Sequence, residues 1–321
     1  MLYRFLKFPA KLALYFYCRK IKINDPDYLN LKGPLLIAAN HPNSFLDAII
    51  ISSLFKEPVH SLVRGDVYKN KFYSTLLYSL NMLPVYRVTE GVENLENNYD
   101  TFKKCKEIFK KDGIVLIFSE GRCINEWKLR PLMKGTARLA FSSWEDGIDL
   151  KILPLAINYD SFRSFGKIVE IFFAKPFKKA PKDYDGYGKF IGAFNDELKS
   201  KLKPLVFEED PKNTKSIKEH FKIKTSFIKK LFLFIPAVLG LIIFSPIYYL
   251  FKIIITKKWN NDHFDSILVA GGFFIFPFYV LLLTVIAIII FNFWWMILVI
   301  ILPFCAWASL QLKEEFNFYK I

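Results

Sequence analysis

The chain has 321 residues, a formal net charge of +15 and an apolar content of 53%, with 34 phenylalanines. This length accommodates one catalytic domain and an additional segment. A basic excess of this kind is typical of proteins that bind nucleic acid, anionic lipid surfaces or anionic substrates. Because no zinc-finger spacing, aromatic RNA-binding motif or clear helix-turn-helix pattern is present, the sequence argues against nucleic acid as a partner.

The cysteines and histidines are scattered along the chain, and neither set contains a close pair. We therefore expect neither a disulfide framework nor a metal site. Isolated thiols and the lack of a cleavable-signal pattern favour a catalytic domain that faces the cytoplasm. The residues concerned are Cys18, Cys105, Cys123, Cys305, His41, His60, His220 and His263.

Residues 1–23 mix aromatic and aliphatic side chains with cationic ones, among them Arg4, Lys7, Lys11, Arg19 and Lys20. Charges recur too often here for a helix that spans a bilayer. The pattern predicts an amphipathic helix in the membrane interface, with its apolar face in the lipid and its lysines toward the headgroups. The alternative is an ordinary surface helix that packs on the catalytic domain.

Residues 24–224 alternate between short apolar runs and helix-like stretches, which predicts an α/β domain with a mixed sheet flanked by helices. Phe177–Gly188 is expected to form a loop, and Glu208–Lys218 a linker. The expected strands are 35–39, 59–63, 83–88, 114–118, 152–157 and 168–174. The expected helices are 46–55, 71–80, 95–110, 132–144 and 189–202.

Residues 225–321 have the composition of a membrane segment. Leu231–Phe251 carries no charge, and its length matches the roughly 20 residues that cross a bilayer. Ser266–Leu312 is also uncharged and about twice as long, so we expect two helices with a break near Asn292–Trp295. The sequence therefore predicts about three spanning helices in a plasma or inner membrane. Lys229 and Lys230 favour a cytoplasmic position for residues 1–230, whereas Lys252, Lys257 and Lys258 favour the opposite orientation.

The first chemically informative passage follows the apolar run 35–39. Asn40 ends this run and His41 comes next, Pro42, Asn43 and Ser44 suit a turn and a helix start, and Asp47 then falls in the first helical turn. A neutral histidine can accept a proton near pH 7, and a carboxylate on its other nitrogen fixes its tautomer. The pair could activate a hydroxyl for attack on a thioester. Alternatively, His41 is a structural residue that closes the strand.

Two further strand ends carry polar groups. Run 114–118 is followed by Ser119, Glu120, Gly121 and Arg122, in which glycine permits close backbone approach and arginine suits phosphate. Run 83–88 delivers Arg87 at its end. Each feature alone is consistent with an ordinary turn or a solvated strand end. Three such strand ends together indicate a site.

These passages resemble the ordered blocks of the glycerolipid acyltransferases, the family of glycerol-3-phosphate and lysophosphatidate acyltransferases, over roughly residues 33–160. The matching segments, in chain order, are His41–Asp47, Arg64–Tyr68 with Leu83–Arg87, Phe118–Gly121, Lys134–Ala137 and Ile152–Leu155. The order of the blocks makes the resemblance specific, since each block alone is weak. The sequence departs from the family pattern in two blocks. Five residues separate His41 from Asp47 instead of four; Ser119 replaces the usual proline, and the arginine that commonly stands third after the glutamate is second here, at Arg122.

The resemblance implies an O-acyltransferase that moves a fatty acyl group onto the hydroxyl of glycerol-3-phosphate, lysophosphatidate or a related lipid in phospholipid synthesis. The donor would be acyl-CoA or acyl-carrier protein, with no other cofactor and no metal. His41 would act as the general base and Asp47 would orient it. The residues expected to bind the acceptor phosphate or to shape the acceptor site are Arg87, Arg122, Arg64, Lys134, Glu120 and Gly121.

Three other classes of protein compete with this interpretation. A lipase or thioesterase is disfavoured because no Gly-x-Ser-x-Gly motif is present. A transporter is disfavoured because Leu231–Phe251 and Ser266–Leu312 hold no ionisable acidic or basic residue. A non-catalytic lipid-binding membrane protein that retains the acyltransferase fold remains open, because the spacing between His41 and Asp47 is altered.

Overall fold

The computed structural model describes residues 2–68, 70–86, 97–179, 186–258 and 261–316. The chain divides into two compact units. Unit 1 comprises Met1–Pro9, Lys22–Asn158 and Glu170–Lys212, and unit 2 comprises Ala10–Ile21, Tyr159–Val169 and Asn213–Ile321.

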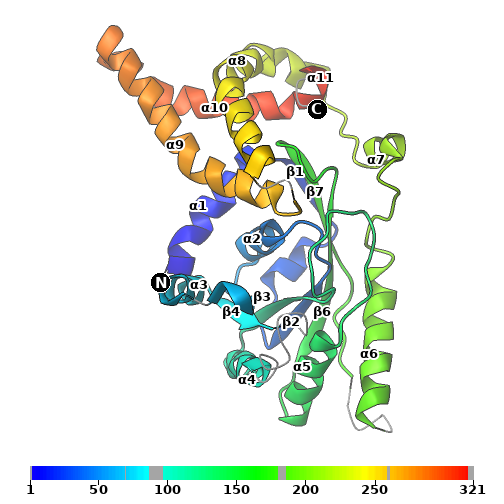
Figure 1. The fold of residues 1–321 in the computed structure, drawn as a ribbon. Helices are drawn as coiled ribbons and strands as arrows, with labels where there is room; N and C mark the ends of the chain where they lie inside the picture. Colours follow the sequence, from blue (N-terminus) through cyan, green and yellow to red (C-terminus); the bar gives the residue numbers. More distant parts are fainter. Residues whose placement is uncertain (1, 69, 87–96, 180–185, 259–260, 317–321) are drawn as a thin grey trace. The chain divides into compact units, whose positions relative to one another are not determined.

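The described residues include a seven-stranded sheet in the order β1-β7-β6-β2-β5-β3-β4 (Figure 1). Strand β2 is parallel to both β5 and β6, and β3 is parallel to both β4 and β5. The register places Ala39 opposite Phe118 and Leu155. The carboxyl ends of β2 and β5, together with Leu155 of β6, therefore lie at the same edge of the sheet. The bounds are β1 Cys18–Ile23, β2 Leu35–Ala39, β3 Val59–Arg64, β4 Met82–Val85, β5 Ile114–Phe118, β6 Lys151–Tyr159 and β7 Lys167–Phe173.

Helices cover both faces of the sheet, which explains why the central strands are continuous apolar runs. All five residues of β2 are fully buried. Figure 1 shows α2 (Phe45–Leu54) on one face, with α5 (Lys134–Glu145) and α6 (Tyr187–Leu202) on the other. Rings of Phe141 and Phe190 meet edge to face at 5.0 Å between these two helices. Shorter elements of this unit are α3 Lys71–Ser79, α4 Asn97–Phe109, η1 Pro26–Asn30 and η2 Gly65–Tyr68. The structure thus confirms the predicted mixed sheet flanked by helices.

The N-terminal helix is shorter than the predicted helix over 1–23. Helix α1 spans Leu2–Tyr17, and Cys18–Ile23 forms β1, which lies beside β7 at the sheet edge. The physical reason is the alternation of Lys20 and Lys22 with β-branched Ile21 and Ile23, which favours a strand. The ion pair between Lys22 Nζ and the buried Glu170 carboxylate (2.9 Å) fixes the end of this strand.

Unit 2 contains three helical segments that are long and apolar enough to cross a membrane: α8 Phe227–Lys258, α9 Phe264–Ile290, and α10 Leu298–Gln311 with the preceding 3-10 helix η6 Phe293–Ile297. The predicted break is present, since α9 ends at Ile290 and Asn292 caps η6. A side chain at Gly240 of α8 would place its Cβ 2.1 Å from the Cys305 carbonyl oxygen of α10. Glycine therefore permits these two helices to approach closely. Part of the expected 208–218 linker is helical, in α7 Thr214–His220, and α11 is Lys313–Phe316.

A buried charged cluster also lies within unit 2. Lys167 of β7 and Asp265 of α9 form an ion pair, and both side chains are fully buried. Lys167 Nζ also donates to the Ser161 carbonyl oxygen at 2.7 Å. Burial raises the pKa of the neighbouring Asp160, and burial lowers the pKa of Lys313 to about 8. The cluster ties the β6–β7 connection to the start of α9.

Candidate active site

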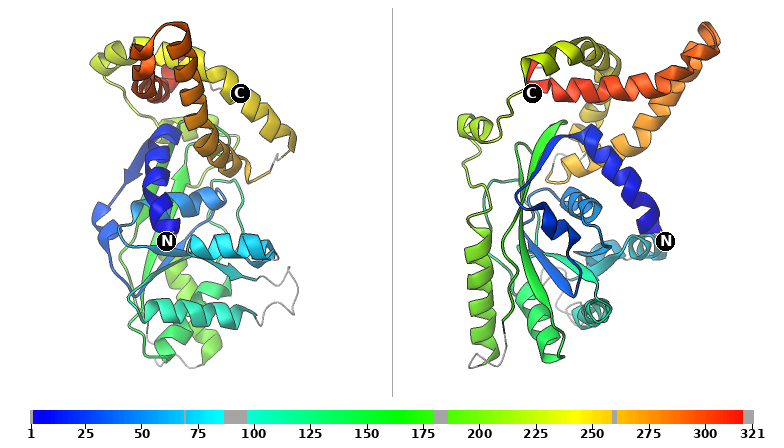
Figure 2. Two further views of the ribbon diagram at one scale, coloured as in Figure 1. Left: turned by 90° about the vertical axis from the view of Figure 1, so that its left-hand side faces the viewer. Right: turned by 180° about the vertical axis from the view of Figure 1, so that it is seen from behind.

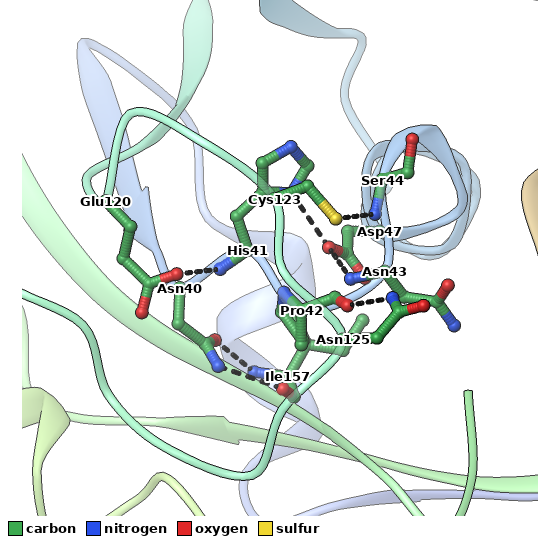
Figure 3. Close-up of polar contacts among 10 residues, drawn as sticks. All are labelled: Asn40, His41, Pro42, Asn43, Ser44, Asp47, Glu120, Cys123, Asn125 and Ile157. Atoms are coloured by element: carbon green, nitrogen blue, oxygen red, sulfur yellow. Dashed lines mark hydrogen bonds and ion pairs between the residues drawn. The ribbon is translucent and has the colours of Figure 1, made fainter. Parts of the chain in front are cut away.

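The site begins at the end of β2, where His41 and Asp47 meet (Figure 3). His41 Nδ1 lies 2.9 Å from Asp47 Oδ2, and the same carboxylate oxygen accepts the backbone N–H of Asn43 at 2.8 Å. The Asp47 side chain is fully buried, whereas the His41 side chain is 17% exposed. A carboxylate at Nδ1 favours a proton on that nitrogen, and leaves Nε2 as the basic nitrogen. In Figure 3 the second ring nitrogen points away from Asp47.

The turn before α2 accommodates the additional residue between His41 and Asp47. Ser44 adopts φ 54° and ψ −143°, and α2 begins at the next residue, which returns Asp47 to the histidine. The loop after β5 holds this turn: the Ser44 N–H donates to Cys123 Sγ at 2.9 Å, and Asn125 Nδ2 donates to the Pro42 carbonyl at 2.7 Å. The longer spacing therefore still permits the hydrogen bond between His41 and Asp47.

The imidazole of His41 stacks on the ring of Phe118. The ring centroids are 3.8 Å apart and the planes differ by 11°. This contact follows from the sheet register, because Phe118 is the last residue of β5 and pairs with Ala39. The stack and the hydrogen bond that His41 Nδ1 donates to Asp47 together restrict rotation of the imidazole.

Glu120 supports the histidine through the backbone. Its two carboxylate oxygens accept the backbone N–H groups of His41 and Arg130, each at 2.9 Å. The side chain is buried, and burial raises the pKa of Glu120. Gly121 follows with φ 68°, and a Cβ there would lie 2.9 Å from Met133 Cγ. Glu120 thus holds the His41 backbone, and the part that Glu120 and Gly121 are expected to play in shaping the acceptor site stays a prediction.

The cationic residues suggested by sequence lie in different settings. Arg64, at the end of β3, forms an ion pair with Asp66, with Nε 3.1 Å from Oδ1. Arg122 and Lys134 are exposed, and Lys134 is the first residue of α5. Arg87 lies outside the described residues. The structure therefore brings together His41, Asp47 and Glu120, with Arg122 on the adjoining turn.

Sequence reasoning did not single out several residues that shape the site. Asn40 joins the end of β2 to β6 by two hydrogen bonds. Its Nδ2 donates to the Ile157 carbonyl at 3.1 Å, and its Oδ1 accepts the Ile157 N–H at 2.8 Å. A polar residue directly after a buried strand was the available indication. Cys123 and Asn125 gave no comparable indication, because their contacts depend on how the loop after β5 folds.

Comparison with known proteins matches residues 20–158 to the family model described as Acyltransferase. No curated protein has a matching sequence. A solved structure, the 1-acyl-sn-glycerophosphate (LPA) acyltransferase PlsC from Thermotoga maritima, is similar to this chain at 15% sequence identity, with a TM-score of 0.44. The match covers 63% of this chain and 79% of that one. The family match encloses His41, Asp47 and Glu120, so the part of this chain that is similar to the acyltransferase family is residues 20–158.

Proposed function

We propose that the chain transfers a fatty acyl group from acyl-CoA or acyl-carrier protein to the hydroxyl of a phosphate-bearing glycerolipid precursor. The observation that carries this proposal is the hydrogen bond between His41 and the buried Asp47 at a strand end of an acyltransferase-family domain. Lysophosphatidate and glycerol-3-phosphate are the acceptors of the related enzymes that the sequence blocks resemble. The product would serve phospholipid synthesis.

In the proposed mechanism, the acceptor hydroxyl oxygen attacks the thioester carbonyl carbon while His41 Nε2 removes the hydroxyl proton. Asp47 stabilises the resulting imidazolium through Nδ1. The tetrahedral intermediate then collapses, the carbon–sulfur bond breaks, and the imidazolium returns its proton to the leaving thiolate. An ester and a free thiol result. General-base assistance of this kind contributes about 10²–10⁴-fold in rate.

Binding of the acceptor phosphate is proposed near the turn after β5. Arg122 on this turn and Lys134 at the start of α5 supply exposed positive charge. The Met133 N–H donates to the Ser119 carbonyl at 2.7 Å, which places the start of α5 beside the same turn. A helix N-terminus attracts anions through its unpaired N–H groups. Arg64 and Arg87 are further candidates for this role, and Arg64 would have to exchange its bond with Asp66 for the phosphate.

A membrane location is proposed for the chain, with the catalytic unit on the cytoplasmic side. Three helical segments are long and apolar enough to cross a membrane. Along α1, Phe5, Phe8, Leu12 and Tyr15 are exposed on one face, which supports the interfacial role expected from the sequence. Lys229 and Lys230 near the start of α8 support the orientation.

The test is an acceptor panel with purified protein in bilayers, offered acyl-CoA and acyl-carrier protein in turn and analysed by product mass. We expect a new ester with at least one phosphate-bearing acceptor, and loss of this product in His41→Ala. The matched control is His220→Ala, because His220 is an exposed histidine of α7 outside the acyltransferase domain. Full activity of His41→Ala would exclude the mechanism.

The same experiment discriminates the competing functions. Release of fatty acid without an acceptor would indicate a thioesterase. Absence of product with every acceptor and donor would favour the non-catalytic lipid-binding protein instead.

A further inference from the structure

The loop after β5 lies beside the site without regular secondary structure of its own. Residues 121–133 form neither a helix nor a strand, so the path of this loop depends on hydrogen bonds to other segments. Cys123 and Asn125 of the loop bond to the turn that follows His41. A group that fixes this loop therefore also fixes the surroundings of His41.

Two consecutive backbone amides of this loop are held by two carboxylates. The Arg130 N–H donates to Glu120 Oε1 at 2.9 Å, and the neighbouring Leu129 N–H donates to Glu208 Oε1 at 3.1 Å. The other oxygen of Glu120 accepts the N–H of His41. Glu208 thus binds the loop one peptide away from the amide that Glu120 shares with the histidine.

Glu208 belongs to a segment that is itself fixed. The buried Asn158 of β6 accepts the Phe207 N–H on its Oδ1 at 3.0 Å, and its Nδ2 donates to a carbonyl of the same segment at 2.9 Å. The Glu209 N–H donates to the Trp127 carbonyl at 2.9 Å. In Figures 1 and 2 the chain that follows α6 runs beside the loop after β5. The segment is bonded to β6 and to the loop, so the Glu208 carboxylate extends from a rigid base.

We propose that Glu208 is a positioning residue of the site, which keeps the loop after β5 in the conformation that supports His41. Glu208 lies outside residues 20–158, the part of the chain that matches the acyltransferase family, so the family match does not include it. Its effect on turnover rests on the proposed function, whereas its effect on the loop does not.

The first experiment measures the loop directly through the thiol of Cys123. This thiol is half-buried, and the other three cysteines are buried. The full-length protein in detergent is treated with N-ethylmaleimide, and labelling of the peptide that contains Cys123 is followed by mass spectrometry. We expect Glu208→Ala to raise the labelling rate about tenfold, because local opening becomes easier when one charge-assisted hydrogen bond is lost. Glu208 is exposed, so its replacement leaves the fold intact.

Two further variants serve as controls. Glu208→Gln keeps an oxygen that accepts the Leu129 N–H and should be labelled at close to the wild-type rate. Asp210→Ala removes a nearby exposed carboxylate that accepts the Lys212 N–H at 2.8 Å, within its own turn, and should also match the wild type. Equal rates in Glu208→Ala and the wild type would overturn the proposal. So would an increase of the same size in either control variant.

Acyl transfer gives the second readout. Glu208→Ala is expected to lower kcat about fivefold or more without a comparable rise in KM for the acceptor, since it loosens the support of His41 and removes no substrate contact. Glu208→Gln should restore kcat. A rise in KM at unchanged kcat would contradict a positioning role. If the wild type itself transfers no acyl group, the proposed function fails, while the labelling rates still decide whether Glu208 holds the loop.

Discussion

His41 is held at three points, two on its imidazole and one on its backbone, by residues of different strands and loops. Asp47 holds Nδ1, Phe118 stacks on one ring face, and Glu120 holds the backbone N–H. A base that is already oriented loses little entropy when the substrate arrives. At the scale of single residues, the site is therefore suited to general-base chemistry before any substrate binds.

Asp47→Asn is expected to lower kcat by about 10²–10⁴-fold, because an amide neither stabilises the imidazolium nor enforces the same tautomer. The substitution conserves the shape of the side chain, so the protein should still fold. Steady-state kinetics at saturating acceptor measure the effect. Asp196→Asn on the exposed surface of α6 is the control. A loss of less than threefold in Asp47→Asn would contradict the role assigned to the carboxylate.

Glu120→Gln is expected to lower kcat by about tenfold or more, with little change in KM for the acceptor. A glutamine carbonyl accepts N–H groups on one side only, so its NH2 faces one of the two backbone amides, at a cost of about 1.5–3 kcal/mol. The split between kcat and KM decides between the two roles. A large rise in KM with unchanged kcat would show that Glu120 binds the acceptor directly, as the resemblance implied.

Some contacts of this site could be predicted from the sequence, and others could not. His41 and Asp47 were recognisable because they follow a buried apolar run at the spacing of a turn and a helix start. The pairing of Arg64 with Asp66 was not foreseen, although the two lie two residues apart. Whether a strand-end arginine pairs with a near neighbour or faces a ligand depends on the backbone path of the following turn.

At the scale of elements, the turn between β2 and α2 stores backbone strain. Ser44 combines a positive φ with ψ −143°, a conformation that is almost restricted to glycine. We expect Ser44→Gly to raise the free energy of unfolding by about 1 kcal/mol, since about 1–3 kcal/mol of strain is relieved and part is offset by added entropy of the unfolded chain. Denaturant unfolding in detergent measures the change.

The contrast for this prediction is Gly121→Ala, where φ is also positive and a new Cβ would approach Met133. That variant is expected to lose stability. A stability change of the same sign in both variants would contradict the strain argument.

The strands and helices of the domain were largely predictable, because apolar runs of four to eight residues mark strands buried on both faces. The elements at the start of the chain were harder to predict. The predicted helix over 1–23 ends at Tyr17, and β1 was missed because its lysines resemble the polar face of an interfacial helix. An edge strand needs few apolar residues, so its composition differs little from that of an amphipathic helix.

At the scale of the whole molecule, unit 2 depends on a fully buried ion pair. Lys167→Met is expected to lower the free energy of unfolding by about 3–5 kcal/mol, because Asp265 would be left as a buried charge without its cation. Thermal unfolding of the detergent-solubilised protein measures this loss. The double variant Lys167→Met/Asp265→Leu should recover most of the stability. A double variant as unstable as the single one would contradict the account.

The grouping of residues into two units could not be predicted from composition. The composition changes near residue 225, yet Ala10–Ile21 and Tyr159–Val169 group with the C-terminal helices. The buried pair between Lys167 and Asp265 explains part of this grouping, since it joins the 159–169 segment to α9. A lysine inside a short strand gives no indication in the sequence that it will be fully buried.

The position of β2 in the sheet has a consequence for synthesis of the chain. Strand β2 lies between β5 and β6, and its contacts join His41 to Glu120, 79 residues later, and Asn40 to Ile157, 117 residues later. Ribosomes make β2 early, but its partners emerge seconds later at about 5–20 residues per second. During that interval a wholly apolar strand of the domain has two unpaired edges, a state prone to aggregation. We therefore expect the nascent chain to be most prone to aggregation until residue 157 has emerged.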